Sequence, residues 1–336
     1  YISFFFFQAE DGIRDLVRSR GLGDVYKRQV MKGAEILRRE KCDIVVALGG
    51  GSPMDCAKAI SITFTNNVPV SEFEGIDEVK IPGLPLICIP TTAGTSADIS
   101  QFAIINDSKD QRKFAIISKL IVPDVALIDT RTTTTMSPEL TAETGMDALV
   151  HAIEAYVSNA SSPITDINAL KAIELIITNL PAAYNEPNNM NYRNNMMMAS
   201  LLAGFAFSNA SLGLVHAMAH SLGGSLDFAH GECNALLLES VINFNFDSAP
   251  EKYFDIARLF EPKLSSKDLK SANDVLKEKI RTLKNSIGLN YTLKDIGVKK
   301  SHIKTLAEKA IMDGCLATNP KSVNLKSLEE CYNNAL

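Results

Sequence analysis

Four of the five histidines lie between residues 151 and 230, and their spacing is typical of metal ligands. Asp147 precedes His151 by four residues, and His216 precedes His220 by the same interval. Residues four apart project from the same face of an α-helix, so each pair would direct two ligating groups the same way. With His230 nearby, one carboxylate and three imidazoles could bind one divalent ion. A single histidine is more often an ordinary core or surface residue, but this clustering favours a metal site.

Metallopeptidases use a similar histidine spacing, and one residue argues against that class. Their His-Glu-x-x-His motif places a glutamate directly after the first histidine, where it acts as the base on the metal-bound water. In this chain Ala217 follows His216. The sequence therefore does not support a peptidase.

A glycine-rich segment at residues 49–55 is the second feature that could do chemistry. It follows a short, apolar, β-branched run at 43–48 and opens a helical pattern at 53–63. Glycines let a pyrophosphate approach the backbone, and the N–H groups of a helix N-terminus face the anion. A glycine run alone is as often a plain tight turn, but its position after a buried strand favours a dinucleotide site.

A threonine-rich loop at residues 90–98 follows another apolar run, at 86–89. Its hydroxyl groups could donate hydrogen bonds to a phosphate or a ribose. Such a turn is more often only structural, but two phosphate-capable turns on one sheet shift that balance toward binding.

The remaining pattern predicts two domains. Short strands are expected at 99–105, 114–117 and 125–128, which gives an α/β domain over 30–136. After Ser137, a capping residue followed by proline, helical spacing continues to the C-terminus. We therefore expect residues 137–336 to form an all-helical domain.

Residues 1–29 differ from the rest of the chain. The apolar run at 2–7 is too short for a signal peptide, lacks a preceding basic region and leads directly into acidic residues. The stretch 8–29 resembles translated sequencing-adapter read-through. We therefore expect a non-native leader that contributes nothing to the core. The alternative is a native N-terminal helix, because 9–17 is weakly compatible with one.

Composition excludes several functional classes. The 336 residues are 46% hydrophobic and 22% charged, as in ordinary soluble proteins with room for two cores. The net charge is −5 and the basic residues are scattered, so neither nucleic acid nor an anionic membrane is an expected partner. The six cysteines form no Cys-x-x-Cys pair, which suggests free thiols and a cytoplasmic location.

Taken together, these segments resemble the iron-containing (group III) alcohol dehydrogenase family. The resemblance runs from about Val30 to Leu336 and rests on the segments 49–55, 90–95, 145–156, 213–220 and 230–231, in that order. It implies a dehydroquinate synthase-like fold: a truncated Rossmann-like α/β domain with a parallel sheet for the cofactor, followed by an all-α metal-binding domain.

The resemblance also assigns roles to individual residues. It implies that Asp147, His151, His216 and His230 hold the metal, and that His220 lines the substrate pocket and relays a proton. The cofactor contacts that it implies are Gly50, Gly51, Ser52, Asp55, Thr91, Thr92, Thr95, Lys113 and Leu140.

The implied reaction is hydride transfer between a primary alcohol or diol and NAD or NADP, with the metal polarising the substrate oxygen. The resemblance to this family implies Fe²⁺ as the metal, although the ligand set also suits Zn²⁺. We expect a small alcohol or aldehyde as substrate and a homodimer or larger homo-oligomer. A glycerol or polyol dehydrogenase is the closest alternative.

Two departures from the family pattern leave a further alternative open. Gly94-Thr-Ser-Ala-Asp98 stands where the family usually has Gly-Thr-Gly-Ser-Glu. Family members also carry roughly two βα units before the glycine-rich segment, including the residue that selects NAD or NADP, and only 30–42 precedes it here. The chain therefore resembles a truncated copy, and a metal-binding but inactive fragment is the alternative.

Overall fold

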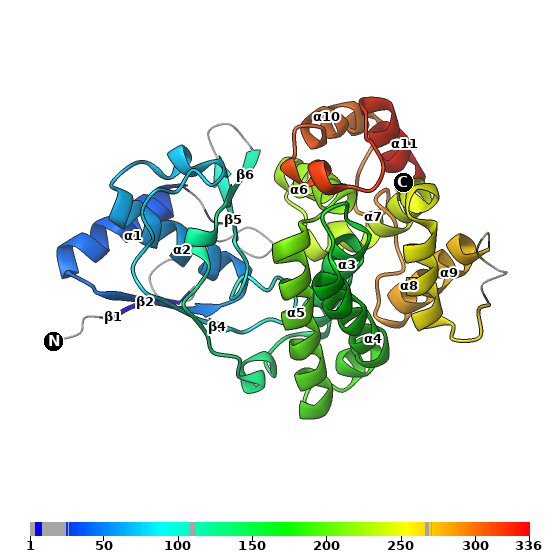
Figure 1. Ribbon diagram of the computed structural model, residues 1–336, viewed down its shortest axis with the longest axis horizontal. Coiled ribbons are helices and arrows are strands. Elements are labelled where there is room, and N and C mark those ends of the chain that lie inside the picture. Colours follow the sequence, from blue (N-terminus) through cyan, green and yellow to red (C-terminus); the bar gives the residue numbers. More distant parts are fainter. Residues whose placement is uncertain (1–3, 9–24, 26, 108–111, 266–268, 270) are drawn as a thin grey trace. The chain divides into compact units, whose positions relative to one another are not determined.

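The fold places the glycine-rich loop and the histidine cluster in different units of the chain. The computed structural model describes residues 4–8, 25, 27–107, 112–265, 269 and 271–336. The chain divides into two compact units, Tyr1–Thr133 and Thr134–Leu336. In Figure 1 the first unit is coloured from blue to cyan-green and the second from green to red.

The first unit contains a parallel sheet with strand order β1-β2-β4-β7. Its strands are β1 (Phe4–Gln8), β2 (Ile44–Gly49), β4 (Leu86–Pro90) and β7 (Val125–Ala126), and its helices are α1 (Lys27–Glu40) and α2 (Gly51–Asn66). Val45 and Ala47 on β2 and Cys88 on β4 are fully buried. Such apolar central strands are typical of parallel sheets that helices cover. The α/β class that the sequence predicts is confirmed.

A second, three-stranded sheet in this unit has the order β3-β6-β5. Its strands are β3 (Gly75–Ile76), β5 (Phe102–Asp107) and β6 (Arg112–Ile117), and short 3₁₀ turns lie at Val70–Phe73, Lys119–Ile121 and Thr130–Thr133. β5 and β6 pair antiparallel, so they do not belong to the parallel sheet. Only residues 108–111 connect them, and a parallel crossover needs a dozen residues or more.

Val25 lies in the core of the first unit, so the expectation that residues 1–29 contribute nothing to the core is wrong for Val25. Val25 is 4% exposed and lies in the hydrophobic core. Its carbonyl accepts the N–H of Asn106 at 2.6 Å, and Lys27 forms an ion pair with Asp107 at 2.6 Å. β1 also pairs in parallel with β2. The adapter-like segment 9–24 lies outside the described residues, so its non-native origin stays a prediction.

The second unit is helical throughout its described part. Its helices are α3 (Pro138–Val157), α4 (Pro163–Asn185), α5 (Met190–Ala210), α6 (Leu214–Leu226), α7 (His230–Asn245), α8 (Pro250–Phe260), α9 (Ala272–Ser286), α10 (Lys300–Ala310) and α11 (Leu325–Ala335). Ser137 caps α3 by accepting the N–H of Leu140 at 3.2 Å, as its sequence position predicted. α6 continues past Gly223 and Gly224. It ends where Asp227 adopts a left-handed conformation, with φ 59°.

Among the described residues, no single helix is both long and apolar enough to cross a membrane. α5 and α6 meet the length and composition requirement only as a pair, and the two are bent by 101° relative to each other.

Candidate metal centre

The predicted metal ligands come together where α3, α6 and α7 meet. Oδ1 of Asp147 lies 3.8 Å from Nε2 of His151, 3.7 Å from Nε2 of His216 and 3.6 Å from Nε2 of His230. Four donors arranged tetrahedrally around an ion with bonds of about 2.1 Å are themselves about 3.4 Å apart. The ligand atoms of Asp147, His151 and His216 all lie within 4.8 Å of one another, and His230 joins this group through its distance to Asp147. The distances from Asp147 therefore fit one divalent ion held by one carboxylate and three imidazoles.

A glycine lets α7 approach α3 closely enough to complete this set. His230 is the first residue of α7, and Gly231 follows it. A Cβ atom at Gly231 would lie 2.2 Å from the backbone oxygen of Glu143 on α3. No side chain fits at that distance, so the glycine is what allows His230 to reach Asp147 across the helix contact.

Glu154 orients one of the ligands, although the sequence interpretation gave it no role. Its carboxylate accepts a hydrogen bond from Nδ1 of His216 at 2.6 Å and also accepts the N–H groups of Gly213 and Val215. This bond fixes the proton on Nδ1, so the other ring nitrogen, Nε2, faces Asp147 as a ligand must. Glu154 lies seven residues after Asp147, two helical turns along the same face of α3. That spacing is the signal that would have identified it.

The electrostatics of the cluster favour a bound cation. Burial would raise the pKa of Asp147, but the imidazoles of His151, His230 and His216 hold it well below its usual range. Burial opposes a charge on His216, yet its contacts with Asp147 and Glu154 raise its pKa to about 9. Two buried carboxylates thus create a site that stabilises positive charge, which a divalent metal would supply.

Ring stacking holds His151 in place. It stacks on Phe207 with ring centroids 4.4 Å apart, and on His216 with centroids 4.6 Å apart. His151 is 4% exposed. A ligand between two rings has little rotational freedom, so its Nε2 is preset toward the cluster.

His220 lies beside the ligands but faces a different partner. Its Nδ1 is 2.8 Å from Oδ2 of Asp313, and its ring stacks on His230 with centroids 5.3 Å apart. Burial would raise the pKa of Asp313, but His220 and the N–H of Cys315 keep it well below the usual range. An ionised Asp313 therefore holds the Nδ1 proton of His220. Nε2 is then the nitrogen available for proton exchange.

Asp313 was not anticipated from the sequence, because it is 93 residues from His220. Cys315 also lies near this pair, and the three side chains are close enough together to hold a metal ion. Burial raises the pKa of the Cys315 thiol well above its usual value, so it remains a protonated thiol and a poor ligand.

The two predicted cofactor loops contact each other in the first unit. The N–H of Thr91 donates to the carbonyl of Gly49 at 2.8 Å. A Cβ atom at Gly50 would lie 3.2 Å from Thr92, and one at Gly51 would lie 2.9 Å from Thr95. Any larger residue would displace these threonines, so the glycines keep the two loops together.

The first turn of α2, which includes Ser52, begins at these loops. Gly50 is the N-cap of α2 and offers no capping side chain. The first N–H groups of a helix have no partner within it, so they can bind an anion such as a phosphate. The loops therefore have the elements of a pyrophosphate cradle.

The other predicted cofactor contacts are less closely connected to these loops. Oδ2 of Asp55 accepts the N–H of Ile104 at 3.0 Å, which is a structural bond between α2 and β5. Lys113 lies on β6, and Leu140 lies in the first turn of α3 in the second unit. Their contact with a cofactor stays a prediction. Lys58, which the sequence interpretation missed, is 1% exposed and donates to the carbonyls of Ser100 and Phe102, both at 2.8 Å.

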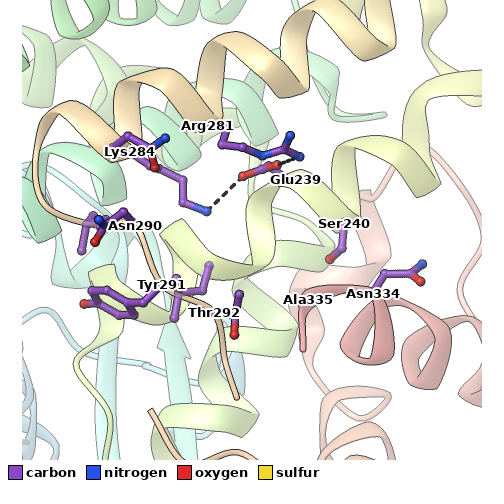
Figure 2. Close-up of a pocket in the computed structure, with 12 residues that line it drawn as sticks. Glu239, Ser240, Arg281, Lys284, Asn290, Tyr291, Thr292, Asn334 and Ala335 are labelled. Carbon is purple, nitrogen blue, oxygen red and sulfur yellow. Dashed lines mark hydrogen bonds and ion pairs between the residues drawn. The ribbon is translucent and has the colours of Figure 1, made fainter. Parts of the chain in front are cut away.

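Figure 2 shows a pocket elsewhere in the second unit, lined by parts of α7, α9, α11 and residues 289–292. Glu239 pairs there with Arg281 at 2.7 Å and with Lys284 at 3.0 Å. None of the predicted site residues lines this pocket. The pocket is therefore separate from the candidate metal centre.

Comparison with known proteins gives consistent matches along the chain. Residues 8–130 match the family model described as iron-containing alcohol dehydrogenase, and residues 141–336 match the C-terminal model of the Fe-containing alcohol dehydrogenase family. The chain is 40% identical to 1,3-propanediol dehydrogenase of Citrobacter freundii over 91% of this chain and 79% of that protein. It is 37% identical to lactaldehyde reductase of Escherichia coli over 91% and 80%, respectively. A crystal structure of 1,3-propanediol oxidoreductase, 39% identical, superposes with a TM-score of 0.90 over 93% of this chain and 81% of that one.

Proposed function

The chain belongs to the iron-containing alcohol dehydrogenase family, and from this membership we propose that it interconverts a small primary alcohol or diol with its aldehyde, using NAD(H). Metal-dependent, NAD-linked alcohol oxidoreduction is the chemistry of the family. The substrate class is our inference from relatives named 1,3-propanediol dehydrogenase, lactaldehyde reductase and NAD-dependent methanol dehydrogenase. The observation that carries the proposal is the cluster of Asp147 with three imidazole nitrogens at 3.6–3.8 Å.

We propose Fe²⁺ as the metal, held by Asp147, His151, His216 and His230. Family membership supports iron, whereas ligand chemistry alone would also accept Zn²⁺. When bound, the metal supplies Lewis acidity toward the substrate oxygen and NAD⁺ supplies the hydride acceptor.

The pair of His220 and Asp313 supports the proton transfer. In alcohol oxidation, Nε2 of His220 accepts the hydroxyl proton, and in aldehyde reduction it returns that proton. Asp313 retains the Nδ1 proton at 2.8 Å and stabilises the positive imidazolium that forms. The side chain of His220 is 15% exposed, so its proton can exchange with solvent.

We also propose a cytoplasmic location. All six cysteines are free and buried, which suits a reducing compartment.

The test is metal-dependent activity of the purified chain. The protein is stripped with a chelator and reloaded with Fe²⁺ or Zn²⁺. Formation of NADH or NADPH is then measured with methanol, ethanol, 1,2-propanediol, 1,3-propanediol and glycerol, with NAD⁺ or NADP⁺ as the cofactor. We expect oxidation only after reloading, with Fe²⁺ and NAD⁺ giving the higher rates. Faster oxidation of glycerol than of any primary alcohol or 1,3-propanediol would favour a polyol dehydrogenase instead.

His216→Ala serves as the site variant, and His302→Ala is its control. His302 is the one histidine outside the cluster, on α10. We expect His216→Ala to lose both metal and activity and His302→Ala to keep both. Alcohol oxidation that persists in the stripped protein would contradict the proposed function.

A further inference from the structure

Asn234 contacts three of the four candidate ligands. It lies one turn after His230 on α7 and is fully buried. Its Nδ2 is 2.7 Å from Oδ1 of Asp147 and 3.2 Å from Nε2 of both His216 and His230. The amide end of Asn234 therefore lies over the face of the ligand set formed by these three atoms.

The other end of the amide is unusual. Oδ1 of Asn234 is buried and has no hydrogen-bond partner among the residues that the structure describes. Nearly all buried polar groups are paired, so an exception needs a specific reason. An apolar side chain of similar size would avoid this cost. The presence of an amide therefore indicates that the Nδ2 end stabilises something at the cluster.

The geometry favours the amide nitrogen, and not the oxygen, as the group that faces Asp147. Rotating the amide by 180° exchanges the two atoms and would place two acceptor oxygens 2.7 Å apart. With the nitrogen in that position, an N–H instead donates to a buried, ionised carboxylate. Hydrogen bonds to charged groups are the stronger kind.

We propose that Asn234 is a positioning residue for the metal centre: its Nδ2 donates to Asp147 and holds that carboxylate in the orientation that ligation requires. This inference rests on the proposed function, because it assumes that the cluster binds a divalent metal. The same side chain also covers one face of the ligand set. Small molecules must then reach the ion from another side.

The experiment measures Co²⁺ binding to the chelator-stripped full chain, by competition with a chromophoric chelator and by the visible absorption of bound Co²⁺. Asn234→Leu keeps the approximate volume and removes the donor. Asn333→Leu, an exposed asparagine on α11, is the matched control. Partners that orient ligands typically contribute about 10- to 100-fold in metal affinity. We expect a loss of that size in Asn234→Leu and no loss in Asn333→Leu, with the absorption bands unchanged.

Two results would overturn the inference. Wild-type affinity in Asn234→Leu would mean that the amide only fills space. A changed Co²⁺ spectrum in that variant would mean that Asn234 is itself a ligand, through Oδ1. If Asn234→Leu does not fold, as judged by circular dichroism, the smaller Asn234→Ala is measured against the same expectations.

The wild-type result separates this inference from the proposed function. If the wild-type chain binds no Co²⁺, the proposed function fails and the inference fails with it. If the wild type binds about one ion and the Asn234 variants bind equally well, only the inference fails.

Discussion

Nδ1 of His216 and Oε2 of Glu154 lie 2.6 Å apart, and the same oxygen accepts the N–H of Gly213 at 3.0 Å. Oε1 accepts the N–H of Val215 at 2.6 Å. One carboxylate from α3 therefore satisfies the start of α6 and also orients the metal ligand in its first turn. Together, these two functions use both oxygens of the Glu154 carboxylate as acceptors.

Glu154→Gln should weaken both the start of α6 and the orientation of His216. Glutamine has one acceptor oxygen, so its NH₂ group would face either His216 or the helix N–H groups. We expect metal affinity to fall by about 10- to 100-fold and the free energy of unfolding by roughly 1–3 kcal/mol. Chelator competition and thermal unfolding measure the two effects. Glu308→Gln, on the exposed side of α10, is the control. Equal metal affinity in the two variants would refute an orienting role for Glu154.

His220→Ala should keep the metal and lose turnover. A positioned acid or base contributes on the order of 10²-fold to the rate, and His220 is the proposed proton acceptor. Asp313→Asn should lower turnover less, because the imidazole remains but loses its charged partner. Steady-state kinetics and elemental analysis check both variants, with His302→Ala as the control. If His220→Ala is purified without metal, His220 is a ligand and the proposed set of four is wrong.

Gly231→Ala should destabilise the protein and weaken metal binding together. The added Cβ would lie 2.2 Å from the backbone oxygen of Glu143, and backbone cannot move aside as a flexible side chain can. Overpacking of this kind typically costs about 1–3 kcal/mol. Gly314→Ala is the control, because no atom of the described residues lies within 4 Å of its Cβ position. Denaturant unfolding of both variants tests this, and equal stabilities would show that α7 and α3 are not in such close contact.

Asp55 should make stability fall as the pH rises. Burial raises its pKa from 3.8 to about 6, although Lys58 and the N–H of Ile104 act in the opposite direction. The folded state therefore binds this proton more tightly than the unfolded state does. Its stabilising contribution is complete below pH 3.8 and is lost as the pH rises to about 6.

The variant Asp55→Asn isolates that contribution, because asparagine cannot ionise. Relative to wild type, its free energy of unfolding should rise by roughly 1–3 kcal/mol across this pH interval. Denaturant unfolding at several pH values measures the difference. Asp43→Asn, at an exposed position before β2, controls for the loss of a carboxylate. A constant difference between Asp55→Asn and wild type would contradict the raised pKa.

Val25→Ala should cost stability although Val25 lies within the stretch expected to be non-native. Val25 is 4% exposed, whereas Val125 on β7 is 46% exposed. Removing buried methyl groups costs roughly 1–2 kcal/mol, and the same change at a surface position costs about 0.5 kcal/mol or less. Thermal unfolding of Val25→Ala and Val125→Ala makes the comparison. Equally small losses of stability in the two variants would mean that Val25 does not contribute to the core.

The features that the sequence reveals are those that short-range periodicity encodes. Asp147 and His151 share a helix face, and so do His216 and His220, so these residues could be recognised before the fold was known. Extending the same periodicity would have added Glu154 and Asn234. Asp313 could not be found in this way, because its pairing with His220 depends on how distant segments pack.

The fold was predictable to a similar degree. The strand–glycine–helix order identified the α/β unit, and the capping Ser137 marked the first helix of the second unit. The antiparallel pairing of β5 and β6 could have been inferred from their four-residue connection. Val25 was missed because the sequence around it resembles adapter sequence. That resemblance gives no information about whether a residue is buried.

The start of α6 also limits how this protein can change during evolution. Gly213 occupies the N-cap position, where serine or aspartate would ordinarily stabilise a helix, yet a Cβ there would lie 3.0 Å from both Glu154 and Asn319. A capping serine or aspartate therefore cannot replace Gly213 to stabilise α6. Mutations at Gly213 and Glu154 should be epistatic, because neither position can be optimised for stability without altering the orientation of His216. Selection on the metal centre thus also fixes the boundary at which α6 begins.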